Sequence, residues 1–201
     1  NTAMGFSALK ANTTGTNNTA VGRNALAANT TGSTGTAVGY NALMSNTTGP
    51  SNVAVGREAL EKNTTGGTNT AVGLQALGDN TTAANNVAVG YLASAKSTTA
   101  AGSVAIGREA LGVAVTTGDY NTAVGYTAGK NITSGYKNVL SGYKAGLALT
   151  TGHSNTFIGT EAGDEQTTSI SNTCIGDWAG QKHTVGYSVM IGSMAGQHAT
   201  S

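Results

Sequence analysis

Few residues of this sequence are of a type that carries chemistry, and their spacing does not assemble a reactive group. His153, His183 and His198 lie near the C-terminal end, at three different positions of the surrounding pattern. None has a spacing that would join it to a carboxylate or to Cys174 as a catalytic triad or a metal site. A single cysteine also excludes an intrachain disulfide and a cysteine-based zinc site. We therefore expect surface histidines, no metal, no cofactor and no enzymatic activity.

Two glycine-rich ligand motifs are also excluded. Residues 125–130 are similar to a phosphate-binding loop, but three rather than four residues separate the glycines, and Asn131 stands where a hydroxyl is required. A calcium-binding roll needs an aspartate that recurs at a fixed position. The aspartates of this chain are sparse and out of register: Asp79, Asp119, Asp164 and Asp177. No calcium ladder is expected.

The composition excludes several classes of protein. The chain has 201 residues, of which 30 are glycine, and only 9% are charged. A formal net charge of +1 provides no basic field for nucleic acid or for an anionic membrane. No apolar run approaches the ~18 residues of a membrane span. Glycine without a three-residue period, together with a single proline, excludes collagen.

One internal repeat organises the whole chain. Its template is Asn-Thr-Ala-Val-Gly-x-x-Ala-Leu-x-x-Asn-Thr-Thr-Gly-x-x, and its first glycine recurs twelve times, mostly 17 residues apart. We call these the marker glycines: Gly5, Gly22, Gly39, Gly56, Gly73, Gly90, Gly107, Gly125, Gly142, Gly159, Gly176 and Gly192. The chain is a single repeat array over residues 1–201, with repeats of an Ala-Leu type over about 1–118 and of an Ala-Gly type over about 119–201.

The length of the period is typical of a β-solenoid, because a two-helix repeat needs about 33 residues. Asn-Thr-Ala-Val alternates and is rich in β-branched residues, so it predicts a short strand. Asn-Thr-Thr-Gly predicts a turn in which the asparagine hydrogen-bonds to the backbone and the glycine has positive φ. A second extended segment is expected over the Ala-Leu pair. The predicted fold class is all-β, a parallel β-solenoid of about twelve 17-residue coils with like residues stacked about 4.8 Å apart.

The two repeat types exchange side-chain volume between two positions. In the Ala-Leu type a leucine lies four residues after the marker glycine, as at Leu26, whereas the Ala-Gly type has glycine there. Over the same stretch the small residue two before the marker glycine becomes Leu140, Phe157, Cys174 and Met190. This exchange predicts that both positions belong to one packed layer. It also predicts that Cys174 is a small buried apolar side chain rather than a reactive thiol.

The predicted strand is apolar on both faces, which favours oligomerisation. The valine one residue before the marker glycine and the alanine two residues before it point to opposite sides. One face can line the coil, but a long exposed apolar stripe on the other is a feature that monomers avoid. We expect this second face to pack against other chains, and alanine suits close approach around a symmetry axis. The alternative is a flattened coil whose second strand covers the face internally.

One column of large side chains is a candidate binding surface. The residue after the marker glycine is often Arg or Tyr, and Arg stacked on Tyr at the coil spacing permits cation–π contact. The candidate residues are Arg23, Tyr40, Arg57, Tyr91, Arg108, Tyr126 and Tyr143. Phe6 and Leu74 occupy the same column. The column is interpreted either as a receptor-binding strip or as a self-supporting ladder that forms part of a subunit interface.

The Asn-Thr-Thr-Gly segments have two further interpretations. Their regular hydroxyls could match an ice lattice, although a turn also satisfies threonine hydroxyls by local hydrogen bonding. The threonines concerned are Thr13, Thr30, Thr47, Thr64, Thr81 and Thr98. Glycosylation sequons begin at Asn12, Asn29, Asn46, Asn63 and Asn80. The turn explains these asparagines without glycans.

The repeats resemble a known family of surface proteins. Residues 18–22, Asn-Thr-Ala-Val-Gly, and 103–107, Ser-Val-Ala-Ile-Gly, are similar to the head repeats of YadA-like trimeric autotransporter adhesins, and similar arrays occur in phage tail-fibre proteins. The resemblance implies a left-handed parallel β-roll, a homotrimer about a common axis, and an extracellular location on a bacterial cell surface or a virion. The crossover rule by itself favours a right-handed coil. The Asn-Thr-Thr-Gly turn makes this repeat longer than the usual one of the family.

These observations favour a non-catalytic structural or adhesive module of an extracellular fibre, either an adhesin head or a tail-fibre shaft. The expected partners are copies of the chain itself, as a homotrimer or an end-to-end fibre, and a host-surface receptor or glycan. Neither nucleic acid nor membrane insertion is expected for this segment. Two alternatives stay open, namely a monomeric ice-binding solenoid and a subunit of a self-polymerising extracellular filament.

Overall fold

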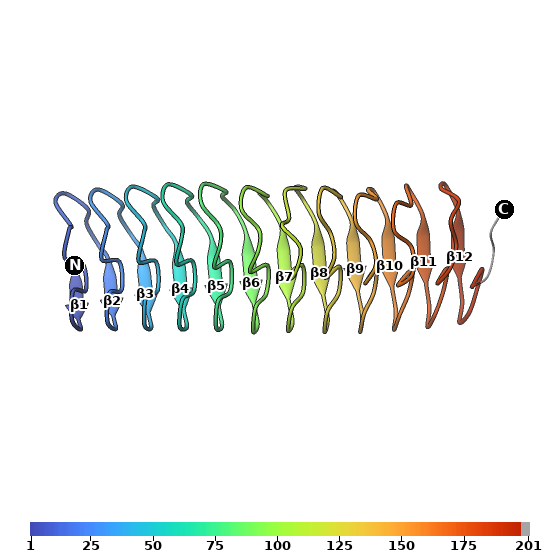
Figure 1. Cartoon of the computed structure of the whole chain (residues 1–201), viewed down its shortest axis with the longest axis horizontal. Coiled ribbons are helices and arrows are strands. Elements are labelled where there is room, and N and C mark those ends of the chain that lie inside the picture. The colour runs from blue at the N-terminus through green and yellow to red at the C-terminus, as the bar shows by residue number, and fades with distance from the viewer. Residues whose placement is uncertain (198–201) are drawn as a thin grey trace.

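The chain forms one parallel β-solenoid, which the computed structural model describes over residues 1–197 (Figure 1). Each coil has one strand of three residues, and no helix occurs in the described part of the chain. The strands form a single twelve-stranded sheet in the order of the sequence. They are β1 (Thr2–Met4), β2 (Thr19–Val21), β3 (Thr36–Val38), β4 (Val53–Val55), β5 (Thr70–Val72), β6 (Val87–Val89), β7 (Val104–Ile106), β8 (Thr122–Val124), β9 (Val139–Ser141), β10 (Thr156–Ile158), β11 (Thr173–Ile175) and β12 (Val189–Ile191).

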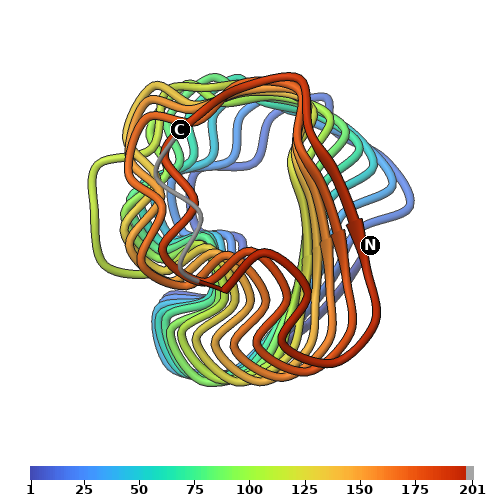
Figure 2. The same ribbon diagram turned by 90° about the vertical axis from the view of Figure 1, so that its right-hand side faces the viewer.

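The stacking of like residues that the period predicts is confirmed. Val21 pairs with Val38, and Val38 pairs with Val55, in the parallel registers of β2, β3 and β4. Viewed along the long axis, the coils superpose with a small progressive rotation (Figure 2). Because each strand pairs only with the strands before and after it, equivalent residues form continuous rows along the rod.

The one 18-residue repeat does not disturb this register. β7 and β8 pair through Val104 and Thr122, as the other neighbours do. The chain between them contains the loop 112–118, which projects beyond the neighbouring loops (Figure 2, yellow-green). Val113 and Val115 of this loop are exposed. The additional residue is therefore absorbed at the perimeter of the coil.

The core is a narrow column of small and medium-sized side chains. In the second coil Ala20, Ala25 and Leu26 are buried, and equivalent residues are buried along the rod. The alanine two residues before the marker glycine therefore points into its own coil. This placement corrects the expectation that alanine lies at a symmetry axis between chains, because the outward face of the strand carries the valine instead.

The expected second strand over the Ala-Leu pair is wrong. This segment forms tight turns, and Leu26 has a φ of 50°, in the left-handed region that non-glycine residues rarely adopt. The Leu26 side chain is nevertheless buried, and its N–H donates to Ala42 O of the next coil at 3.0 Å. Burial and the bond between coils offset the unfavourable backbone conformation.

The glycine of the Asn-Thr-Thr-Gly turn also differs from its predicted role. Positive φ belongs to the marker glycines, such as Gly22 at 134°, and not to Gly32 of the turn. A Cβ on Gly32 would lie 2.5 Å from Asn29 Oδ1 and 2.9 Å from Gly49 O in the following coil. Glycine suits this position because successive turns approach closely. The later coils that lack glycine here have small residues instead: Ala83, Ala100 and Ser169.

Buried asparagines join the turns of successive coils. Asn46 donates from Nδ2 to Asn29 Oδ1 at 2.8 Å and to Gly49 O of its own turn at 3.0 Å. Asn63 donates to Asn46 Oδ1 in the same way, at 2.8 Å. The predicted bond from asparagine to the backbone of its turn is confirmed. Because the amide nitrogens are buried and hydrogen-bonded, the geometry supports the turn interpretation of the sequons.

Candidate functional site

The column after the marker glycines, which we call the ladder, begins as an alternating stack of aromatic and cationic side chains. Arg23 Cζ lies 5.9 Å from the ring centroid of Phe6 and 5.9 Å from that of Tyr40. Arg57 Cζ lies 5.8 Å from the Tyr40 centroid. Each of these residues follows a marker glycine, so the coil spacing sets the distance between them. The predicted cation–π contact is confirmed here.

The ladder has a second stretch beyond Leu74. Arg108 lies between two rings, with its Cζ 5.3 Å from the centroid of Tyr91 and 5.8 Å from that of Tyr126. Tyr126 and Tyr143 then stack directly on each other, with centroids 5.5 Å apart and an interplanar angle of 15°. The seven candidate residues are therefore brought together in two stretches, separated by the aliphatic Leu74.

Carboxylates beside the ladder restrain its arginines. Arg57 Nε donates to Glu58 Oε1 at 2.9 Å, and Arg108 Nε lies 3.4 Å from Glu109 Oε1. The hydrogen bond from Arg57 holds the pKa of the Glu58 carboxyl below its ordinary value. The pKa of Glu109 is lowered chiefly by Lys130, whose Nζ lies 2.7 Å from Oε2. The carboxylates thus stay ionised near neutral pH, which favours an ordered ladder.

The ladder leaves mainly ring edges and guanidinium groups accessible to a ligand. Within each stretch the stacked neighbours cover the ring faces, whereas Tyr40, Tyr91, Tyr126 and Tyr143 keep 43–46% of their surface exposed. An exposed cation–π contact contributes about 0.5–1 kcal/mol. The geometry fits a self-supporting ladder that stabilises the stack of coils. Recognition of a receptor by these residues stays a prediction.

A second row presents aliphatic side chains to solvent along the outer face of the sheet. These residues precede the marker glycines and are 36–39% exposed in a single chain. We call them the aliphatic row: Val38, Val55, Val72, Val89, Ile106, Val124 and Ile158. The Thr or Val two residues earlier lies on the same face of each strand. The alternative of a flattened coil that covers this face is therefore wrong.

Five of the six threonines considered for ice binding donate a hydrogen bond within the rod. Thr30 Oγ1 donates to Thr47 O, and Thr47 Oγ1 donates to Thr64 O, each at 3.0 Å. The same bond recurs between other coils of this segment. Each of these hydroxyls therefore uses its one hydrogen internally and keeps only lone pairs for water.

The histidines differ in part from the expectation of surface side chains. His183 is only 5% exposed, with Nε2 2.8 Å from Ser188 Oγ, so the expectation is wrong for this residue. His153 is half-buried and stacks on Tyr136, with centroids 4.5 Å apart. His198 lies outside the described residues. The Tyr136–His153 pair is not among the predicted contacts, although both residues stand six residues before a marker glycine, where earlier coils have small residues.

Cys174 is buried in the core, as its position in the repeat predicts. Gln166 Nε2, eight residues earlier in the chain, lies 3.6 Å from its Sγ. Burial raises the pKa of the Cys174 thiol to about 11. The side chain therefore stays protonated at neutral pH and serves as a small apolar group.

The described residues contain neither a cluster of metal ligands nor a membrane-spanning helix. Over residues 1–197, no three His, Cys, Asp or Glu side chains come close enough to hold a metal ion. In that same range no helix has the length and apolar character needed to cross a bilayer.

Comparison with known proteins yields no assignment, because no protein-family model, curated protein or solved structure matches the chain.

Proposed function

We propose that this chain is a non-catalytic structural module of an extracellular fibre, in which three copies pack as left-handed rolls around a common axis. The observation that carries the proposal is the aliphatic row, which follows the outer face of the sheet along most of the rod. An isolated chain would keep this stripe in water, and burial against further copies removes it from solvent. The resemblance to YadA-like head repeats supports the trimer, the left-handed coil and a bacterial-surface or virion location.

The regular register supports contact between identical chains. Equivalent residues recur at one strand spacing, so parallel copies related by rotation meet with like coils at the same height. The low charge content, 9% of residues, places few like charges against each other in such an assembly. The ladder runs one residue beyond the marker glycines, beside the aliphatic row, and its exposed edges are the proposed contact with a host surface.

The ice-binding alternative gains no support from the threonine rows. Ice recognition needs hydroxyls and methyl groups that are free to order water on a flat face. The first threonine of each Asn-Thr-Thr-Gly turn instead donates its hydrogen to the next coil, as Thr47 does to Thr64 O. These threonines are accounted for by their role in joining coils.

The mass of the protein in solution tests the assembly. Sedimentation equilibrium should give three times the 19.8 kDa mass of one chain. Val72→Lys places a charge in the aliphatic row and should yield monomers, whereas Thr48→Lys, at an exposed site in a turn, should leave the trimer intact. A wild-type protein that stays monomeric at high concentration would remove the trimer from the proposal.

A further inference from the structure

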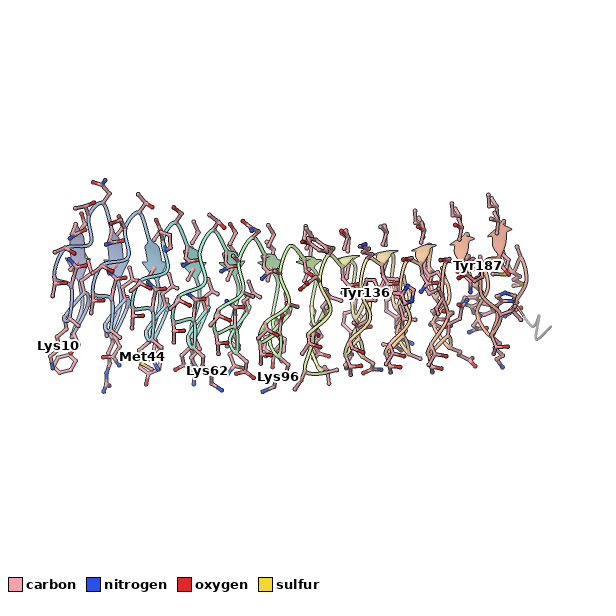
Figure 3. All side chains as sticks on the ribbon, turned by 90° about the horizontal axis from the view of Figure 1, so that it is seen from above. Lys10, Met44, Lys62, Lys96, Tyr136 and Tyr187 are labelled. Carbon is pink, nitrogen blue, oxygen red and sulfur yellow. The ribbon has the colours of Figure 1, made fainter. Side chains whose placement is uncertain are left out.

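An open pocket lies at one corner of the rod, between the chain segments that lead into β8 and β9. Its lining includes Asp119 and Tyr120 from one coil and Ser134, Tyr136 and Lys137 from the next. Its volume is about 400 Å³, within the range of small-molecule sites. Tyr136 lies in the C-terminal half of the rod, between Lys96 and Tyr187 (Figure 3). The pocket is separate from both the ladder and the aliphatic row.

The two aromatic rings of the pocket are supported from behind. Tyr136 stacks on His153, with an interplanar angle of 14°. His153 belongs to the following coil, whereas the pocket lies toward the preceding coil, so the other face of the Tyr136 ring is turned to the pocket and carries the flexible Lys137 side chain, with Nζ 5.9 Å from the centroid. Tyr120 lies against Gly102, where an added Cβ would be 2.7 Å from Tyr120 Cδ1. Support of this kind lowers the entropy cost of binding a ligand.

The fold itself does not require aromatic residues at these two positions. The equivalent pairs of the earlier coils, six and five residues before the marker glycine, are small: Thr16 and Asn17, Ser33 and Thr34, Pro50 and Ser51, Gly67 and Thr68, Ala84 and Asn85, Ala101 and Gly102. Those coils nevertheless pair in the same register as the later ones. The rings at Tyr120 and Tyr136 therefore add a surface that the solenoid can be built without.

Polar groups surround the rings. Asp119 Oδ1 accepts a hydrogen bond from Ala101 N–H at 2.8 Å, which fixes the carboxylate at the rim of the pocket. Lys137 Nζ lies 5.9 Å from the Tyr136 centroid and supplies donors. Ser134 adds an exposed hydroxyl. A flat ring face flanked by one carboxylate and several donors matches a pyranose, which has an apolar C–H face and a rim of hydroxyls.

We propose that this pocket binds a neutral pyranose residue of a surface glycan. The sugar stacks its C–H face on Tyr136 and hydrogen-bonds through its hydroxyls to Asp119 and Lys137. Asp119 and Lys137 give the pocket one charge of each sign and no net charge, which favours a neutral sugar. The inference rests on the surface contact in the proposed function, and it does not depend on the trimer.

Saturation-transfer NMR with four methyl glycosides, those of glucose, galactose, mannose and N-acetylglucosamine, tests the proposal on the whole chain. At least one glycoside should receive saturation from the protein. Tyr136→Ser, which copies Ser33 of an earlier coil, should weaken its binding by about tenfold or more. Tyr136→Phe should retain binding, and Tyr187→Asn, an exposed tyrosine in a later coil, should leave it unchanged. A shared melting temperature would show that the variants keep the fold.

The possible failures are distinguishable. Absence of transfer to all four glycosides, or equal binding by wild type and Tyr136→Ser, overturns the pocket whatever the mass of the assembly. If the protein binds a sugar but sediments as a monomer, the proposed sugar site is supported and only the proposed trimer is contradicted.

Discussion

The ring of Phe157 fills the space that a side chain at residue 163 would occupy. A Cβ added to Gly163 would lie 2.6 Å from Phe157 Cδ2, and the two residues belong to one coil. In the second coil the volumes are reversed, because Leu26 is buried beside the small Ala20. The exchange predicted between the two repeat types is therefore confirmed as two ways of filling one layer.

Placing the small side chain at residue 157 and the large one at residue 163 should restore part of the stability that is lost when Phe157 alone is truncated. Phe157→Ala should lower the free energy of unfolding by about 3–5 kcal/mol, because it opens a cavity in the core. Adding Gly163→Leu to that variant recreates the pair found at Ala20 and Leu26, and it should recover part of the loss in urea denaturation. Gly163→Leu alone should destabilise the chain by overpacking. A double variant less stable than Phe157→Ala would contradict the shared layer.

The repeat length and the side-chain columns were sufficient to predict the one strand that each coil has, its register, the ladder contacts and the burial of Cys174. Local preferences could not predict the turn at Leu26, because leucine enters the left-handed region only where burial and bonds between coils offset the cost. His183 stands seven residues after its marker glycine, in the column of the buried Asn29 and Asn46, so the repeat contains a signal for its burial that the expectation of a surface side chain did not use. The pocket at Tyr136 depends on residues of two coils and interrupts the repeat, so the periodic pattern concealed it.

The row of buried asparagines ends with an unsatisfied group. Asn80 Oδ1 is buried and has no hydrogen-bond partner in the described part of the chain, because Ser97 replaces asparagine in the next coil. Ser97→Asn should donate to this oxygen, as Asn80 does to Asn63 Oδ1 at 2.8 Å. We expect the free energy of unfolding to rise by about 1 kcal/mol. Ser97→Ala, which supplies no donor, should give no gain, and thermal melts of both variants provide the comparison.

Thr127 combines an unfavourable backbone conformation with an unpaired hydroxyl. Its φ is 54°, and its buried Oγ1 lacks a partner in the described residues. Asparagine has a similar volume and tolerates this region better than a β-branched residue, as at Asn24 and Asn41 of the same column. Thr127→Asn should therefore stabilise the chain by about 1 kcal/mol. Thr122 in β8 has an ordinary φ, so Thr122→Asn should not raise the free energy of unfolding. If both substitutions raised it equally, the backbone conformation of Thr127 would not be the cause.

Cys174 should react slowly with thiol reagents in the folded protein. Because burial raises its pKa to about 11, very little thiolate exists at pH 7 to 8. Ellman's reagent should label it only after denaturation. Cys174→Ala, which restores the alanine of the earlier coils, should keep the fold with a modest loss from the smaller side chain. Rapid labelling of the native protein would show that this coil opens locally.

Each coil adds one strand spacing to the length of the rod, and its strand pairs only with the strands of the two neighbouring coils. Excision of residues 57–73 would set β4 against β6, whose sequences are both Val-Ala-Val, and would keep the 17-residue interval between marker glycines. Loss or duplication of one such 17-residue unit would therefore shorten or extend the rod by about 4.8 Å without a new kind of contact. The number of repeats alone therefore sets the reach of the rod.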